Sequence, residues 1–287
     1  MGKENSSVTR VWPVLLELMC NDRKPSESLG LMLDLAFKAS GNVLAKRLQD
    51  HAGPVLQDLV VKPATARTEY GLKVRLPRCF EYSVPPTERF LLWLIEHTGD
   101  GCLPKPGLNV AQRNAGRRPD LFGDNQANRD DARKEAIRNL GLAGTDRSRN
   151  QWWTFEGPTS VDCFLETSDL VLLIEGKRTD SVAEGTDWCR MRNQIARNLE
   201  AAQSIAHGKR YAVLLAAEED IDFSPAKIAS GFPHMNESEK AFLADHYIGC
   251  ITWKQICEAA CLTLKLDRDF QDVESAQRWL QDQSYID

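Results

Sequence analysis

The stretch DLVLLIEGKR, Asp169–Arg178, constrains the fold more than any other part of the sequence. Its five consecutive apolar residues, Leu170–Ile174, are typical of a strand that is buried on both faces of a sheet. Two charged residues, Glu175 and Lys177, follow this apolar run. Because residues two apart on a strand point to the same face, we expect these two side chains to lie together where the strand leaves the core.

The sequence around this strand predicts an α/β fold in which a central mixed sheet is flanked by helices. Hydrophobic periodicity and turn residues divide the chain into alternating helical and extended segments. The predicted segments are a helix over 125–142, strands over 151–157, 160–167 and 169–178, a helix over 188–208 and a strand over 210–219. The order α-β-β-β-α-β indicates an antiparallel meander followed by a helical crossover into a parallel strand.

Residues 1–105 are predicted to form a mainly helical N-terminal region. Helix-period apolar residues dominate its first half and return in Thr87–Thr98, while Thr68–Val84 alternates like a short strand or hairpin. Irregular chain rich in glycine and proline follows, which is typical of a linker or a functional loop. We therefore place a boundary near Pro104–Gly107, between the region 1–105 and an α/β domain over 106–287 with a helical C-terminal extension.

The composition is that of a soluble globular protein, with 42% hydrophobic and 27% charged residues. No run of 18 apolar residues occurs, so we expect no membrane partner. The eight cysteines are scattered, and no secretory signal is recognisable, so we expect reduced thiols and a cytoplasmic location. The net charge of −5 argues against nonspecific coating of nucleic acid, although basic residues outnumber acidic ones from Lys177 to Arg210.

A second carboxylate is predicted to lie beside Glu175. If Ser168-Asp169 is a two-residue turn, counting outward from it places Asp162 opposite Glu175. Like charges directly opposite each other destabilise a sheet, and Lys177 neutralises only one of the two. Oxygen ligands with an excess negative charge suit Mg²⁺ or Mn²⁺, and an ammonium group beside a metal-bound water can orient that water or take up its proton.

These residues resemble a known pattern. Asp162, followed thirteen residues later by Glu175-Gly176-Lys177, is similar to the D…E-x-K signature of the PD-(D/E)xK phosphodiesterase superfamily, although Val161 stands where the signature has proline. The order α-β-β-β-α-β also resembles the restriction-endonuclease-like core of that superfamily. The resemblance covers about a third of the chain. It implies a metal-dependent nuclease, most often one that cleaves DNA, in which Asp162 and Glu175 hold Mg²⁺ or Mn²⁺ and Lys177 positions the attacking water.

The resemblance also implies further site residues. Glu135, in the helix before the first predicted strand, is the best candidate for a third metal carboxylate. Gln194 matches the polar residue that many members carry on the helix after the lysine strand, and a helix over 188–206 would place it on one face with Arg190 and Arg197. The predicted contacts to the phosphodiester backbone are Arg178, Arg190, Arg192, Arg197, Arg117 and Arg118.

Two other classes of function remain open. The first is a non-catalytic nucleic-acid-binding module on the same fold, and the second is an assembly module whose N-terminal helices mediate contacts. Glu175 and Lys177 as an exposed ion pair would carry little energy and no function. We favour catalysis because a degenerate site would not be expected to keep Asp162, Glu175 and Lys177 together. A homodimer is compatible with this hypothesis, since double-strand cutting by such enzymes generally needs two active sites.

Overall fold

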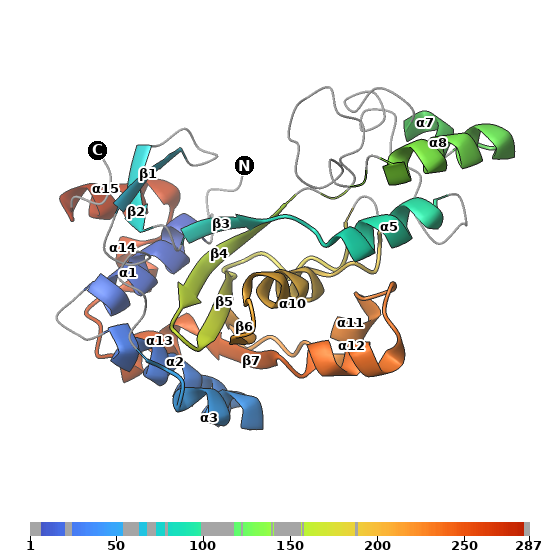
Figure 1. Ribbon diagram of the computed structural model, residues 1–287. Helices are drawn as coiled ribbons and strands as arrows, with labels where there is room; N and C mark the ends of the chain where they lie inside the picture. Colours follow the sequence, from blue (N-terminus) through green and yellow to red (C-terminus); the bar gives the residue numbers. More distant parts are fainter. Residues whose placement is uncertain are drawn as a thin grey trace.

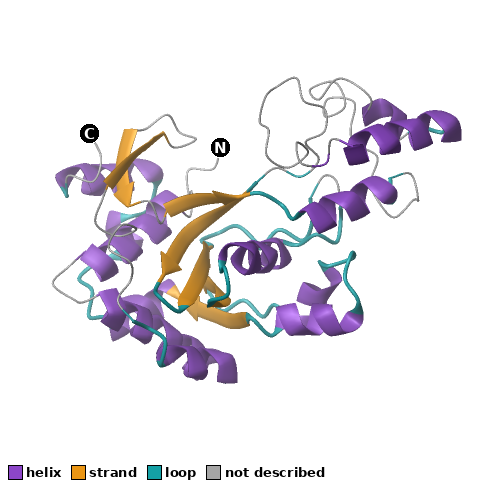
Figure 2. Ribbon diagram, in the orientation of Figure 1, coloured by secondary structure: helices purple, strands orange, loops and turns teal. Residues whose placement is uncertain are grey.

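The computed structural model has an α/β fold in which helices cover both faces of a five-stranded mixed sheet (Figures 1 and 2). It describes residues 7–20, 25–53, 63–67, 73–77, 80–98, 118–121, 123–138, 140, 156, 158–186 and 189–283. No helix in this described part of the chain is long and apolar enough to cross a membrane.

The first half of the chain contributes helices, a hairpin and one strand of the main sheet. These elements are η1 (a π-helix, Ser7–Val11), α1 (Trp12–Cys20), α2 (Pro25–Ser40), α3 (Val43–Gln49), β1 (Pro63–Arg67), β2 (Lys73–Pro77), β3 (Phe80–Val84), α5 (Glu88–Glu96), α7 (Arg118–Leu121) and α8 (Gln126–Arg138). The second half contributes β4 (Thr159–Glu166), β5 (Leu170–Gly176), α10 (Gln194–Ile205), β6 (Arg210–Ala217), α11 (Pro225–Ser230), α12 (Glu237–Ala244), β7 (Tyr247–Thr252), α13 (Trp253–Ala259), α14 (Leu266–Asp269) and α15 (Val273–Asp282).

The main sheet has the strand order β3-β4-β5-β6-β7. Strands β3, β4 and β5 form an antiparallel meander, and β5, β6 and β7 run parallel. The β4–β5 ladder pairs Glu166 with Val171 and Cys163 with Ile174, as the predicted turn requires. The ladder ends at the pair Cys163–Ile174, so the predicted pairing of Asp162 with Glu175 lies one step beyond its last pair.

Strand β5 lies at the centre of the sheet, and all of its residues are buried. Its alternating side chains enter two separate cores. Leu172 and Ile174 pack with η1, α1, α2, α13 and α15 on one face, whereas Val171 and Leu173 pack with α10, α11 and α12 on the other. A strand with helices on both faces has no exposed side, which explains the uninterrupted apolar run.

The edge of the sheet differs from the sequence prediction. Strand β3, from the first hundred residues, is the antiparallel partner of β4. The strand predicted over 151–157 lies outside the described residues except for Glu156, which is in a bend. The boundary predicted near Pro104–Gly107 also lies outside the described residues. Because β3 precedes that boundary and β4 follows it, the two sequence regions share one sheet.

The helices around the sheet agree with the prediction in the described part of the chain, except at one end. Helix α10 begins at Gln194 and not at Trp188, because the side chain of Asn193 caps it by accepting a hydrogen bond from the N–H of Ala196. Arg190 therefore lies in the turn before the helix and not on its face. Helix α8 packs against α5 and α7 in a third small core, away from the sheet (Figure 1).

The two-sided burial of β5 predicts a large difference between two otherwise identical substitutions. Val171→Ala removes two methyl groups from a fully buried position of β5 and should lower the free energy of unfolding by about 2 kcal/mol. Val43→Ala, at a position that is 58% exposed, should change it by less than about 0.5 kcal/mol. Urea titration of both variants measures the difference, and equal effects would contradict the central position of β5.

Candidate active site at the end of strand β5

The carboxylate of Glu175 is buried and fully hydrogen-bonded. Its side chain is 3% exposed and receives donors from helix α10 and from its own strand. Gln194 Nε2 lies 2.5 Å from Glu175 Oε1, and Asn198 Nδ2 lies 2.8 Å from Oε2. Lys177 Nζ lies 3.0 Å from Oε1, as predicted for residues two apart on a strand. Since Gln194 and Asn198 are one helical turn apart, a single face of α10 holds both oxygens.

Asp162 is held from the other face of the sheet. Its Oδ1 accepts a hydrogen bond of 2.9 Å from the hydroxyl of Ser7, at the start of η1. Its Oδ2 accepts one of 2.7 Å from the backbone N–H of Gly176. The first helical segment of the chain therefore reaches the site, which explains why the polar Ser7 lies among the buried residues of η1.

The electrostatic surroundings of Asp162 are unfavourable to its charge. Burial, and next the negative charge of Glu175, raise the pKa of Asp162 well above its usual range. The hydrogen bonds from Gly176 and Ser7 and the charge of Lys177 act in the opposite direction without cancelling this effect. The two carboxylates are therefore close enough to repel each other, and Lys177 alone does not neutralise them.

Gly176 is needed at this point because the chain is crowded on three sides. A Cβ atom on Gly176 would come within 2.2 Å of Val11 Cγ2 and 3.4 Å of Asp162 Oδ2. The carbonyl of the next residue, Lys177, accepts a hydrogen bond of 2.8 Å from Trp253 Nε1. Helix α13 and η1 thus fix the backbone between the two charged residues of the strand.

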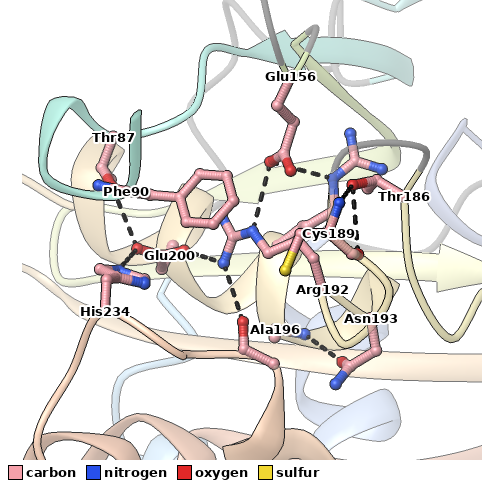
Figure 3. Close-up of polar contacts among 12 residues, drawn as sticks. Thr87, Phe90, Glu156, Thr186, Cys189, Arg192, Asn193, Ala196, Glu200 and His234 are labelled. Carbon is pink, nitrogen blue, oxygen red and sulfur yellow. Dashed lines mark hydrogen bonds and ion pairs between the residues drawn. The ribbon is translucent and has the colours of Figure 1, made fainter. Parts of the chain in front are cut away.

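A network of buried charges fixes the start of α10 (Figure 3). Arg192, in the turn before the helix, is 1% exposed, and its guanidinium group lies 3.9 Å from the ring centroid of Phe90. It forms ion pairs with Glu200 and, at 3.4 Å, with Glu156. Although burial opposes ionisation, the charge of Arg192 lowers the pKa of Glu200. The prediction that Arg192 contacts phosphate is therefore wrong, because the residue is enclosed by its own carboxylates.

The same network extends to three other segments. Glu200 Oε1 accepts hydrogen bonds from Thr87, the N-cap of α5, at 3.1 Å and lies 2.8 Å from His234 Nε2. Arg197 Nε lies 3.4 Å from Glu156 Oε1. Because these contacts join α5, residue 156 and the segment after α11 to α10, they hold the helix whose Gln194 contacts Glu175.

The other predicted site residues lie at different places. Glu135 is on α8, which packs against α5 and α7, and the structure does not bring it together with Asp162 and Glu175. Among the described residues, no three His, Cys, Asp or Glu side chains gather closely enough to hold a metal ion. Arg178 follows Lys177 and is half-buried, and Arg190 is exposed. Arg117 lies outside the described residues, and Arg118 begins α7.

Some residues of the site were not predicted from the sequence. Asn198 lies four residues after Gln194, and this helical spacing was a signal that could have identified it. Ser7 and Trp253 carry no such signal, because their contacts with Asp162 and Lys177 join segments far apart in the chain.

In comparisons with known proteins, no protein-family model, no curated protein and no solved structure matches this chain. The chemistry that the site can perform therefore follows from its own residues alone.

The crowding at Gly176 predicts opposite effects for two glycine substitutions. Gly176→Ala should lower the free energy of unfolding by about 1–3 kcal/mol, because its methyl group overlaps Val11 and displaces η1. Gly30→Ala, in α2 with no atom within 4 Å of the new methyl group, should raise it by about 0.5–1 kcal/mol. Thermal and urea unfolding measure both, and a stable Gly176→Ala variant would contradict the close contact with η1.

The raised pKa of Asp162 predicts that replacing it with its neutral analogue, asparagine, stabilises the fold by an amount that depends on pH. Since the folded state favours the protonated form, the charge of Asp162 costs stability as the pH rises from about 4 through the raised pKa. Asp162→Asn should therefore stabilise the metal-free protein at pH 7.5, and the gain should shrink toward pH 4.

Asp272→Asn is a control whose effect on stability at pH 7.5 should have the opposite sign. The backbone N–H of Ser275 holds the pKa of Asp272 below its usual range, so its charged form stabilises the fold above about pH 4. This variant should be destabilised at pH 7.5, and the loss should shrink as the pH falls. Unfolding curves across this pH range test both signs, and a destabilised Asp162→Asn at pH 7.5 would argue against repulsion between the carboxylates.

Proposed function

We propose that the chain is a metal-dependent phosphodiesterase of the PD-(D/E)xK type that cleaves nucleic acid, with DNA as the expected substrate. The observation that carries this proposal is the presence of two buried, mutually repelling carboxylates, Asp162 and Glu175, at the exit of a buried strand. Lys177 lies beside Glu175 and forms an ion pair with it. Supporting it, β4, β5, α10 and β6 have the order and directions that the restriction-endonuclease-like core requires.

The residues fit a hard divalent cation. Asp162 and Glu175 supply oxygen ligands. Burial, and next the negative charge of Glu175, raise the pKa of Asp162, and Lys177 does not offset them. Mg²⁺ is commonly held by one or two carboxylates, with water and substrate phosphate completing its coordination. The pair Asp162 and Glu175 therefore suffices for the proposal, and Glu135 need not take part. When bound, Mg²⁺ or Mn²⁺ would neutralise negative charge on the phosphodiester oxygens and make a water more acidic.

The protein residues have separate roles in this proposal. Lys177 is held in place by its ion pair with Glu175, and its ammonium group orients the attacking water. Once it has given a proton to solvent, its neutral amine can take up the proton of that water. Gln194 and Asn198 fix both oxygens of Glu175, so that the carboxylate does not rotate when substrate binds. Arg178 and Arg190, which both lie in the segment between β5 and α10, would contact the phosphodiester backbone.

A non-catalytic nucleic-acid-binding module is the second candidate. It is favoured by the complete hydrogen bonding of Glu175, whose two oxygens already have three donors. A carboxylate satisfied in this way can serve stability alone. The two candidates differ in one measurable respect, since only the enzyme turns over its substrate when a divalent cation is added.

The proposal is tested by incubating the full chain with single- and double-stranded DNA and RNA, with Mg²⁺, with Mn²⁺ or with a chelator. We expect cation-dependent cleavage, with DNA cut faster than RNA. Lys177→Ala should lower the cleavage rate by about 100-fold or more, as expected for loss of a proton-transfer group. Asp162→Asn should lower it at least as strongly while the protein remains folded.

The matched control is Lys227→Ala, which removes another lysine–glutamate ion pair. Lys227 Nζ lies 2.7 Å from Glu184 Oε1 at the surface, so this variant loses the same charge and should cleave like the wild type. Cleavage that persists unchanged in Lys177→Ala would overturn the mechanism. Binding without cleavage by the wild type, in every metal condition, would establish the binding module instead.

A further inference from the structure

A pocket of about 550 Å³ lies at the opposite end of β5 and β6 from Asp162 and Glu175. It is formed by the end of α3, the start of β6 and the residue before β7. Its lining includes Arg47, Asp50, His51, Lys209, Arg210, Tyr211 and His246. In the β5–β6 ladder, Leu170 pairs with Arg210 beside the pocket, and Gly176 pairs with Ala216 at the other end. The pocket is therefore six residues, or roughly 20 Å, away from the carboxylates.

The pocket carries uncompensated positive charge. Lys209 is neutralised by Glu166, at 2.6 Å, whereas neither Arg47 nor Arg210 forms an ion pair with a carboxylate in the described part of the chain. Arg210 Nη1 lies 3.1 Å from His51 Nδ1. Since a guanidinium group only donates, His51 Nδ1 is the acceptor of this hydrogen bond. Asp50 is the one carboxylate in the lining, so the arginines are left with donors suited to phosphate.

A planar aromatic surface adjoins these cations. The ring of Tyr211 stacks on that of His246 with centroids 4.2 Å apart and an angle of 11°. Phe242, which is 56% exposed, meets His246 edge-on at 4.8 Å. His246 Nδ1 lies 2.8 Å from the carbonyl oxygen of Phe242, which fixes the plane of the imidazole ring. Tyr211 is itself buried beneath His246, so the partly exposed ring of His246 is the one that a base of single-stranded nucleic acid can reach beside the two arginines.

We propose that this pocket binds a nucleotide unit, with its phosphate on Arg47 and Arg210 and its base against His246. The ligand is a nucleotide of a single strand or a free mononucleotide, which share this chemistry. Duplex is not expected, because its bases are stacked on each other and do not offer a free face. The site is independent of phosphodiester cleavage, since it uses none of the residues around Glu175.

The test measures binding of a fluorescently labelled single-stranded oligonucleotide to the full chain by anisotropy, in a chelator so that no cleavage occurs. The double variant Arg47→Ala/Arg210→Ala should bind roughly tenfold more weakly, with a salt dependence shallower by about two. The double variant Lys254→Ala/Arg278→Ala, which removes two exposed cations from α13 and α15, is the charge-matched control and should bind like the wild type. Equal binding by the double variant and this control would overturn the proposal.

Competition separates the ligand classes. Unlabelled adenosine monophosphate should displace the strand at lower concentration than inorganic phosphate, and His246→Ala should weaken the mononucleotide without weakening phosphate. Mononucleotide that competes as well as the strand, per molecule, would identify the free nucleotide as the ligand. Phosphate that competes as well as the nucleotide, or duplex that binds better than single strand, would refute the nucleotide site. Lys177→Ala should bind the oligonucleotide like the wild type. Loss of the nucleotide site can therefore be distinguished from loss of the proposed cleavage.

Discussion

The burial of the Glu175 carboxylate is the constraint on which the rest of this structure depends. A carboxylate taken out of water is costly unless donors replace its solvent, and removing one partner of such a group typically costs several kcal/mol. Glu175 obtains its donors from Lys177 on its own strand and from Gln194 and Asn198 on α10. The crossover helix must therefore start and lie where both amides reach the end of β5, and the cap by Asn193 defines that start.

The two carboxylates at this strand exit are not equivalent. Glu175 is surrounded by donors on the α10 face, whereas Asp162 has a hydroxyl from Ser7, one backbone N–H and an unfavourable electrostatic balance. A cation that approached the pair would gain most from Asp162, because that is the charge the protein leaves least compensated. The first helical segment is thus part of the site, although it lies more than 150 residues away in sequence.

Local sequence patterns predicted the parts of this site that are encoded locally. The apolar run, the turn at Ser168-Asp169 and the period of two were enough to predict the β4–β5 register and the contact between Glu175 and Lys177. The pairing of β3 with β4, by contrast, joins segments some 80 residues apart, and no local pattern encodes it. The start of α10 was missed because the apolar residues before it continue the helical period, while a buried ion-pair network holds them in a turn.

Carboxylates lie at one end of the sheet and arginines at the other, so the proposed cleavage and the proposed nucleotide binding occupy separate places. Parallel strands bring their carboxyl ends to one edge, where Asp162 and Glu175 lie, and their amino ends to the other, where Arg210 begins β6. In the proposed function, a polyanion reaches the first edge only when a cation offsets its carboxylates, whereas the second edge attracts it without metal. A chain with a net charge of −5 would thus hold nucleic acid through a local basic surface and admit a phosphate to the carboxylates only with a divalent ion. The proposed metal dependence of cleavage and metal independence of binding would then have one electrostatic origin.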